Sequence, residues 1–168
     1  MTTKNTDVFG GHGGSEFTDT HDVASWGRIT QIHIRHGAEV DAIATTYANG
    51  QYLSHGGTGG TLTTISLRDD EFITSVDLRS GARLDQITLH SSKGVTYGPY
   101  GGNGGSPHSV NFGDDVLQYF FGRSGARIAD RAERAQRRRR FRSRQHESVR
   151  GYATDALDRD AAAARRAA

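Results

Sequence analysis

Short runs in which apolar and polar side chains alternate fill the sequence from about residue 17 to about residue 121. In the run 31–35, Ile32 and Ile34 alternate with polar residues, which is the pattern of a strand with one buried and one exposed face. The other runs are also rich in Ile, Val, Thr and Tyr, and turn residues separate them. The pattern predicts an all-β domain, with strands at 29–35, 42–47, 62–67, 72–78 and 86–90.

Glycine supplies 22 of the 168 residues, against 2 from proline, and most of the glycines precede residue 130. Two glycine motifs recur together at spacings of 44 to 46 residues. The first is centred on glycines 37, 81 and 125, and the second is Gly-Gly-x-Gly-Gly at 10–14, 56–60 and 101–105. Two motifs with one period predict three copies of one supersecondary unit around an approximate threefold axis.

The composition changes abruptly after residue 128, where the chain becomes rich in Arg and Ala. Residues 131–168 contain 12 arginines and 5 acidic residues, whereas residues 1–130 contain 9 basic and 14 acidic residues. We therefore expect a folded domain at 1–130 and a basic tail at 131–168, either helical or disordered. Arg137 to Arg140 form a dense basic patch, so binding of nucleic acid or an anionic surface through the tail is the alternative function.

Several classes of protein are disfavoured by what the sequence lacks. Without cysteine there is no disulfide framework and no thiolate zinc site, and the eight histidines show no metal-ligand spacing, so we expect no metal and no cofactor. No nucleophile is paired with a base, so we expect no enzyme. Acidic groups at 69–71 and 114–115 are expected in solvated turns.

The sequence also lacks the usual targeting and membrane signals. No run approaches the roughly 18 apolar residues of a membrane helix. The polar N-terminus shows no secretory signal, so we expect a cytoplasmic protein or one secreted by a non-classical route. Whether the chain forms a homo-oligomer is left open.

The two glycine motifs have the chemistry of a sugar pocket. Sugar hydroxyls are neutral and directional, and an ionised carboxylate is their best acceptor because charge-assisted hydrogen bonds are about twice as strong as neutral ones. In Gly-x-x-x-Asp, the glycine permits a sharp turn and the Asp can accept from two adjacent hydroxyls. In Gly-Gly-x-Gly-Gly, the absence of side chains lets backbone N–H groups approach a ring. The motifs therefore predict two halves of one binding site.

Residues 8 to about 128 resemble the jacalin-related lectins. The resemblance rests on the three glycine clusters and on four further segments, His55-Gly56-Gly57, Glu71-Phe72-Ile73, Tyr97-Gly98-Pro99-Tyr100-Gly101 and Phe120-Phe121-Gly122-Arg123-Ser124-Gly125. It implies a β-prism I fold, in which three four-stranded Greek-key sheets surround a pseudo-threefold axis. It also implies a lectin that binds glycans and is not an enzyme.

The resemblance implies how the motifs pair. The first site would combine Gly37, Ala38, Glu39 and Asp41 with Gly60, and the second Gly81, Ala82, Arg83 and Asp85 with Gly105. The Asp would bind the O4 and O6 hydroxyls of the sugar, and the last glycine of the cluster would bind O3. Nine residues precede the first glycine cluster, whereas galactose-binding members begin with a free glycine, so mannose- or glucose-containing glycans are the expected partners.

The third site departs from this pattern. Gly14, Gly125, Ala126 and Arg127 match the motif, but Ala129 stands where the other sites have Asp, and Asp130 follows one residue later. A slip of one residue in a strand turns a side chain to the opposite face. The site is therefore either inactive or rearranged so that Asp130 reaches into it. The charged sequence from residue 131 on also replaces the apolar strand that the family has there, and a change of reading frame is one possible origin.

Overall fold

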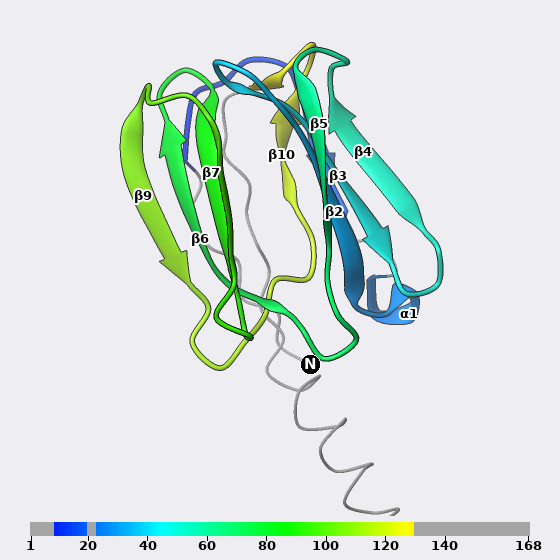
Figure 1. Cartoon of the computed structure of the whole chain (residues 1–168). Coiled ribbons are helices and arrows are strands. Elements are labelled where there is room, and N and C mark those ends of the chain that lie inside the picture. Colours follow the sequence, from blue (N-terminus) through cyan, green and yellow to red (C-terminus); the bar gives the residue numbers. More distant parts are fainter. Residues whose placement is uncertain (1–8, 20–22, 130–168) are drawn as a thin grey trace, which may run out of the picture. The chain divides into compact units, whose positions relative to one another are not determined.

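The structure is a computed structural model, and it describes residues 9–19 and 23–129. Antiparallel strands make up almost all of its regular structure, with one short helix, as the all-β prediction requires (Figure 1). The elements are β1 Ser15–Thr18, α1 Val23–Trp26, β2 Ile29–His36, β3 Val40–Tyr47, β4 Tyr52–Gly56, β5 Thr61–Ser66, β6 Ile73–Ser80, β7 Leu84–Ser91, β8 Thr96–Gly101, β9 Ser106–Asn111, β10 Phe121–Ser124 and β11 Ile128–Ala129.

The strands form three antiparallel sheets, and two of them have the same topology. One four-stranded sheet has the order β4-β3-β2-β5, and the other has the order β8-β7-β6-β9. The third sheet has the order β1-β10-β11 within the described residues, which end at Ala129. The first two sheets repeat at the 44-residue spacing seen in the sequence, since β2 begins at Ile29 and β6 at Ile73. The predicted repeat is therefore confirmed in these two sheets.

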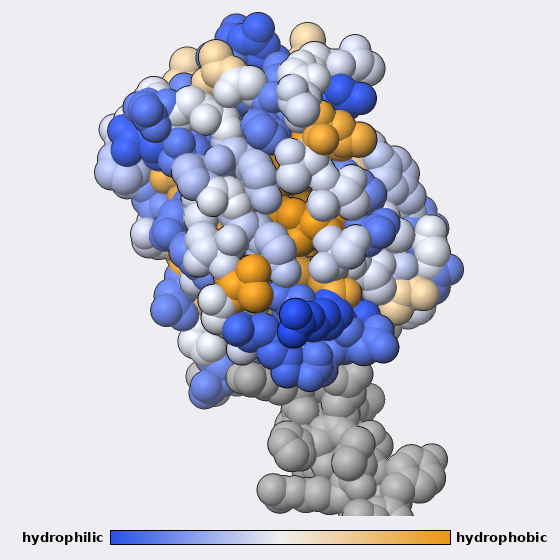
Figure 2. Space-filling view, in the orientation of Figure 1, coloured by the Kyte–Doolittle hydropathy of each residue, from blue (hydrophilic) through white to orange (hydrophobic). Residues whose placement is uncertain are grey.

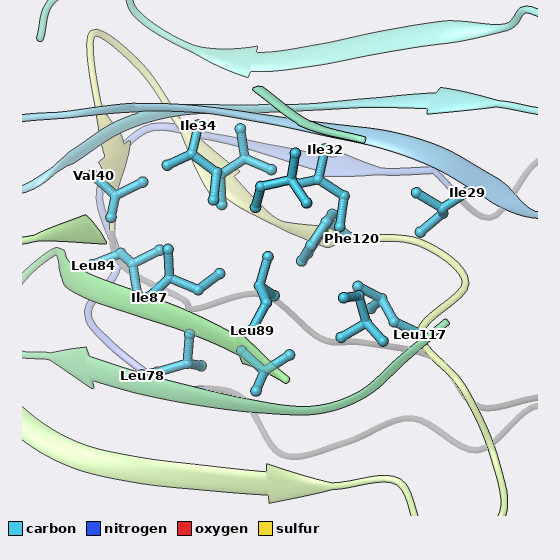
Figure 3. Packing of buried hydrophobic residues seen from close by; sticks show 14 of the residues in the cluster. Ile29, Ile32, Ile34, Val40, Leu78, Leu84, Ile87, Leu89, Leu117 and Phe120 are labelled. Carbon is cyan, nitrogen blue, oxygen red and sulfur yellow. The ribbon is translucent and has the colours of Figure 1, made fainter. Parts of the chain in front are cut away.

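A common apolar core lies between the sheets. Ile32 and Ile34 are fully buried, as their alternation in β2 predicts, and Ile87 and Leu89 on β7 are fully buried as well. Side chains from β2, β3, β6 and β7 point toward one another, and Phe120 and Leu117 enter between them from the chain that leads to β10 (Figure 3). The periodicity of the sequence thus produces a single core that holds the strand ends in fixed positions.

Each four-stranded sheet carries a β-bulge at the start of its second strand. In the first sheet His36 pairs with Val40 and Arg35 with Ala42, so Asp41 is an extra residue without a partner across the ladder. Asp85 is the extra residue at the corresponding place in the second sheet. A bulge re-aims the side chain of its extra residue. Both bulged residues are the aspartates of the Gly-x-x-x-Asp motif.

The prediction that the acidic residues at 69–71 and 114–115 lie in solvated turns is wrong for one residue of each group. Asp69, Asp70 and Asp114 are exposed, but Glu71 is only 1% exposed and Asp115 only 4%. Glu71 is buried because its carboxylate closes the turn before β6: it accepts from the N–H of Arg68 at 3.1 Å and from the hydroxyl of Tyr97 at 2.8 Å. Buried carboxylates need such donors.

The prediction for the C-terminal tail concerns residues outside the described ranges. The basic tail at 131–168 lies there, so its boundary and its helical or disordered state stay predictions. In the ranges 9–19 and 23–129, no helix is long and apolar enough to cross a membrane. No group of three or more potential metal-binding side chains occurs in those ranges either.

Candidate carbohydrate-binding site

Three hairpin turns with the same hydrogen bond lie at one end of the three sheets. In each turn, the N–H of the motif glycine donates to the carbonyl two residues later, from Gly37 to Glu39 at 3.0 Å, from Gly81 to Arg83 at 3.0 Å and from Gly125 to Arg127 at 2.9 Å. The loops that carry the glycine clusters reach the same end, at the top of Figure 1. In Figure 2 strongly hydrophilic side chains at this end alternate with pale and weakly apolar ones.

Each aspartate contacts the glycine cluster that the family resemblance paired with it. A Cβ added to Gly60 would lie 2.5 Å from Oδ2 of Asp41, and one added to Gly105 would lie 2.5 Å from Oδ2 of Asp85. Both glycines also have a positive φ, +66° and +62°, which disfavours any residue with a side chain. Only glycine therefore fits where the two motifs meet.

Backbone donors lie beside both carboxylates. The N–H of Gly57 donates to the carbonyl of Asp41 at 3.0 Å, which joins the glycine cluster to the strand carrying the aspartate, and Gly102 does the same to Asp85 at 2.9 Å. In the part of the chain that the structure describes, the N–H groups of Gly60 and Gly105 donate to no protein acceptor. Each site thus combines one carboxylate acceptor with a nearby backbone donor.

Neighbouring repeats close the sites. A Cβ on Gly57 would collide with the carbonyl oxygen of Ala126, and one on Gly102 with that of Ala38. Each of these clusters therefore fits between its own aspartate and the hairpin of another repeat. The hairpin residues Ala38, Ala82 and Ala126 are exposed.

Charged side chains connect the three hairpins. The carboxylate of Glu39 accepts from Arg127 at 2.6 Å and from Arg83 at 3.0 Å. Burial alone would raise the pKa of Glu39, but the hydrogen bonds from Arg127 and Arg83 outweigh it and hold the pKa below its ordinary value. Arg127 also lies 3.5 Å from Oδ1 of Asp41, so the third hairpin supplies a cation to the first site.

Three arginines that the sequence analysis assigned no role hold the glycine clusters. Arg79 donates to the carbonyls of Gly104 at 2.9 Å and Gly105 at 3.0 Å, and two other arginines occupy its position in the other repeats. These are Arg35, which donates to Thr58 at 3.1 Å, and Arg123, which donates to Gly13 and Gly14 at 2.8 Å each. Each of them lies two residues before the motif glycine, so the repeat alignment contained the signal.

The third set of residues comes together only in part. Gly14 lies against the turn of Gly125, since a Cβ on Gly14 would be 2.7 Å from the carbonyl oxygen of Ser124. Arg123 pairs directly with Ala129, so the described strand lacks the bulge found at Asp41. The predicted acceptor Asp130 lies outside the described residues.

Two His–Asp pairs occur among the described residues, one beside the glycine cluster 56–60 and one in the second sheet. His55 contacts Asp19 at 2.7 Å and stacks on Phe17, which joins β4 to the N-terminal segment. Asp77 accepts from both His90 at 2.7 Å and Ser109 at 2.5 Å. In a triad the histidine, not the aspartate, contacts the serine. We interpret both pairs as structural contacts, the first between β4 and the residue after β1 and the second between β6 and β7.

Comparison with known proteins places the chain in a family. The family model of the jacalin-like lectin domain matches residues 6–130. Horcolin from Hordeum vulgare subsp. vulgare is 36% identical over 131 residues, covering 70% of this chain and 86% of horcolin. Griffithsin from Griffithsia sp. (strain Q66D336) is 34% identical over 104 residues, covering 61% of this chain and 74% of griffithsin.

A solved structure agrees with these sequence relatives. A mannose-binding jacalin-related lectin from Ananas comosus superposes with a TM-score of 0.68 at 26% identity, covering 79% of this chain and 96% of that protein. The β-prism expected from the resemblance is thereby confirmed. The chain belongs to the jacalin-like lectins, a family of carbohydrate-binding proteins.

Proposed function

We propose that this chain binds mannose- or glucose-type sugars in two pockets. Pocket 1 consists of Gly37, Ala38, Glu39, Asp41 and Gly60. Pocket 2 consists of Gly81, Ala82, Arg83, Asp85 and Gly105. The contact between each aspartate and the last glycine of its cluster carries the proposal, because it puts a carboxylate acceptor beside a backbone N–H without a protein acceptor.

The geometry suits a pair of adjacent hydroxyls. The carboxylate of Asp41 or Asp85 can accept from both hydroxyls, while the N–H of Gly60 or Gly105 donates to a third oxygen of the same ring. The preference for mannose rests on the Ananas comosus relative, which is itself described as mannose binding. The third set has Ala129 in place of this aspartate, so it is either inactive or rearranged so that Asp130 supplies the carboxylate.

Each pocket alone should bind weakly. A shallow site buries little surface, and every polar group of the sugar must lose water, so we expect dissociation constants on the order of millimolar for a monosaccharide. Two pockets on one domain can engage a branched glycan together, which raises the affinity through effective concentration.

Calorimetric titration of the full chain with methyl α-mannoside tests the proposal. Asp41→Asn and Asp85→Asn keep the side-chain volume but remove the charge, so each should weaken its own pocket by about tenfold or more. Each single variant should therefore retain about one binding equivalent of two, and the double variant should show no heat of binding. Full binding by the double variant would refute the role of the carboxylates.

Asp69→Asn is the matched control. Asp69 is an exposed carboxylate in the turn between β5 and β6, at the opposite end of the strands, and it pairs with Arg28 at 3.0 Å. Its replacement removes the same charge without touching either pocket, so sugar binding should equal that of the wild type. Equal loss of binding in all three variants would mean that net charge, and not the pockets, determines the affinity.

A further inference from the structure

The glycine clusters have almost no side chains with which to hold their conformation. Arg79 contacts its cluster with two donors, Nε to the carbonyl of Gly104 at 2.9 Å and Nη2 to that of Gly105 at 3.0 Å. Arg123 makes the same two-donor contact to Gly13 and Gly14, at 2.8 Å each. The planar guanidinium has its donors in a fixed fork, so it sets the directions of two successive carbonyls at once.

Fixing a carbonyl also fixes an N–H. The peptide unit is planar and trans, so the carbonyl of Gly104 and the N–H of Gly105 belong to one rigid plane and point in opposite directions. The N–H of Gly105 is the donor that pocket 2 offers to a sugar. The bond from Arg79 therefore turns this donor away from the arginine and limits its rotation, although Arg79 itself lies outside the pocket residues.

The first repeat has a looser version of the same contact. Arg35 donates from Nη1 to the carbonyl of Thr58 at 3.1 Å and to those of Gly59 and Gly60 at 3.4 Å. The peptide unit that carries the N–H of Gly60 is the one whose carbonyl belongs to Gly59, and it receives only a long bond. Arg35 therefore restrains pocket 1 less than Arg79 restrains pocket 2.

We propose that Arg79 and Arg35 are positioning residues of the two sugar pockets, which act by orienting the N–H of Gly105 and of Gly60. The inference rests on the proposed function for its effect on sugar affinity. It adds that the affinity of a pocket depends on an arginine outside it, and that pocket 2 depends on its arginine more strongly than pocket 1.

The variants Arg79→Ala and Arg79→Lys test the proposal, with NMR of the labelled full chain during titration with methyl α-mannoside. Arg79→Ala should weaken pocket 2 by about tenfold, because it removes two charge-assisted bonds that order the donor. Pocket 1 of the same sample should keep its wild-type affinity and serves as the internal reference. Arg79→Lys keeps the charge without the fork and should fall between the wild type and Arg79→Ala. Arg35→Ala should weaken pocket 1 by less than tenfold.

Arg28→Ala is the matched control. Arg28 also donates to a backbone carbonyl, that of Arg68 at 2.9 Å, but at the other end of β2. Its loss should leave both pockets at wild-type affinity. An equal weakening of both pockets in Arg28→Ala and Arg79→Ala would overturn the proposal, because it would show a general loss of stability.

NMR relaxation of the Gly104 and Gly105 backbone amides, measured without sugar, tests the positioning role of Arg79 separately from the proposed sugar binding. Absence of sugar binding in the wild type would refute the proposed function alone, since this second measurement needs no ligand. Greater motion of these two amides in Arg79→Ala than in the wild type supports the positioning role. Unchanged amide relaxation, or an unchanged affinity of pocket 2, overturns it.

Discussion

Glu39 shows how a single residue can connect the repeats. It belongs to the first hairpin, yet its carboxylate accepts from Arg83 of the second hairpin and Arg127 of the third. These ion pairs are partly exposed, so together they should add no more than about 1 kcal/mol to stability at pH 7. Their main effect is to fix the relative positions of three turns, two of which line the proposed pockets.

The lowered pKa of Glu39 predicts a pH dependence with a definite sign. A carboxyl whose folded-state pKa is depressed contributes its full stability above the unfolded value of about 4.3, and the contribution is lost as the pH falls through the folded-state value. The variant Glu39→Gln cannot titrate there. Urea unfolding at pH 7 and at about pH 3.5 should therefore show a smaller loss of stability in the variant than in the wild type. Equal losses would contradict the role of Glu39.

At the scale of elements, the turn before β6 depends on a buried carboxylate. Burial alone would raise the pKa of Glu71, but hydrogen bonds from Ser91, from the Arg68 N–H and from Tyr97 outweigh it and lower the pKa. Tyr97 belongs to β8, so the contact ties the turn to a strand of the same sheet. Burial, together with the same bond, raises the pKa of Tyr97 to about 12.

Removing one hydroxyl should therefore destabilise the domain. Tyr97→Phe leaves a buried oxygen of Glu71 without this donor, which we expect to cost about 1–3 kcal/mol of unfolding free energy. Thermal unfolding followed by circular dichroism measures the loss. Tyr52→Phe is the control, because Tyr52 is 54% exposed and its change should leave Tm within error of the wild type. A Tyr97→Phe variant as stable as this control would mean that Glu71 is satisfied in another way.

The strands could be predicted from local alternation and repeat spacing. Contacts between residues distant in the sequence could not. Alternation located β2 to within one residue of its observed end, since its period of two is a property of the strand itself. The bulge at Asp41 was not predicted, because a bulge exists only in the pairing of two strands. The burial of Glu71 depends on Tyr97, 26 residues away, which no local pattern displays.

The same division applies to the site. The contact between Asp41 and Gly60 could be expected because both motifs recur with one period and the family resemblance supplied their pairing. The approach of Arg127 to Asp41 could not be expected from the sequence, because it joins two repeats across the end of the domain. The repeat alignment contains Arg79, but a role for it follows only from its hydrogen bonds to the glycine cluster.

At the scale of the whole molecule, both proposed pockets lie at the same end of one folded domain. A single glycan surface can therefore occupy them together. Linked sites gain about 10² to 10⁴ in affinity over one site when the ligand can span them. Among the described residues, Tyr52 and Leu62 are the large hydrophobic residues that are exposed.

Loss of one pocket should therefore affect surface binding more than monosaccharide binding. Asp41→Asn should lower the affinity for a surface coated densely with branched mannose glycans by about 10² or more, while pocket 2 keeps its affinity for methyl α-mannoside. Surface plasmon resonance at low and high glycan density provides the comparison. Similar affinities of wild type and variant at high density would show that the pockets act separately.

The central claim is that two glycine and aspartate pockets bind mannose-type sugars. NMR titration of the ¹⁵N-labelled chain with methyl α-mannoside tests it most directly, with methyl α-galactoside as the reference sugar. We predict saturable shifts of amides in 37–41, 59–60, 81–85 and 104–105 at millimolar mannoside, and none with galactoside at the same concentration. No shifts at millimolar mannoside, or shifts confined to residues outside these loops, would contradict the account.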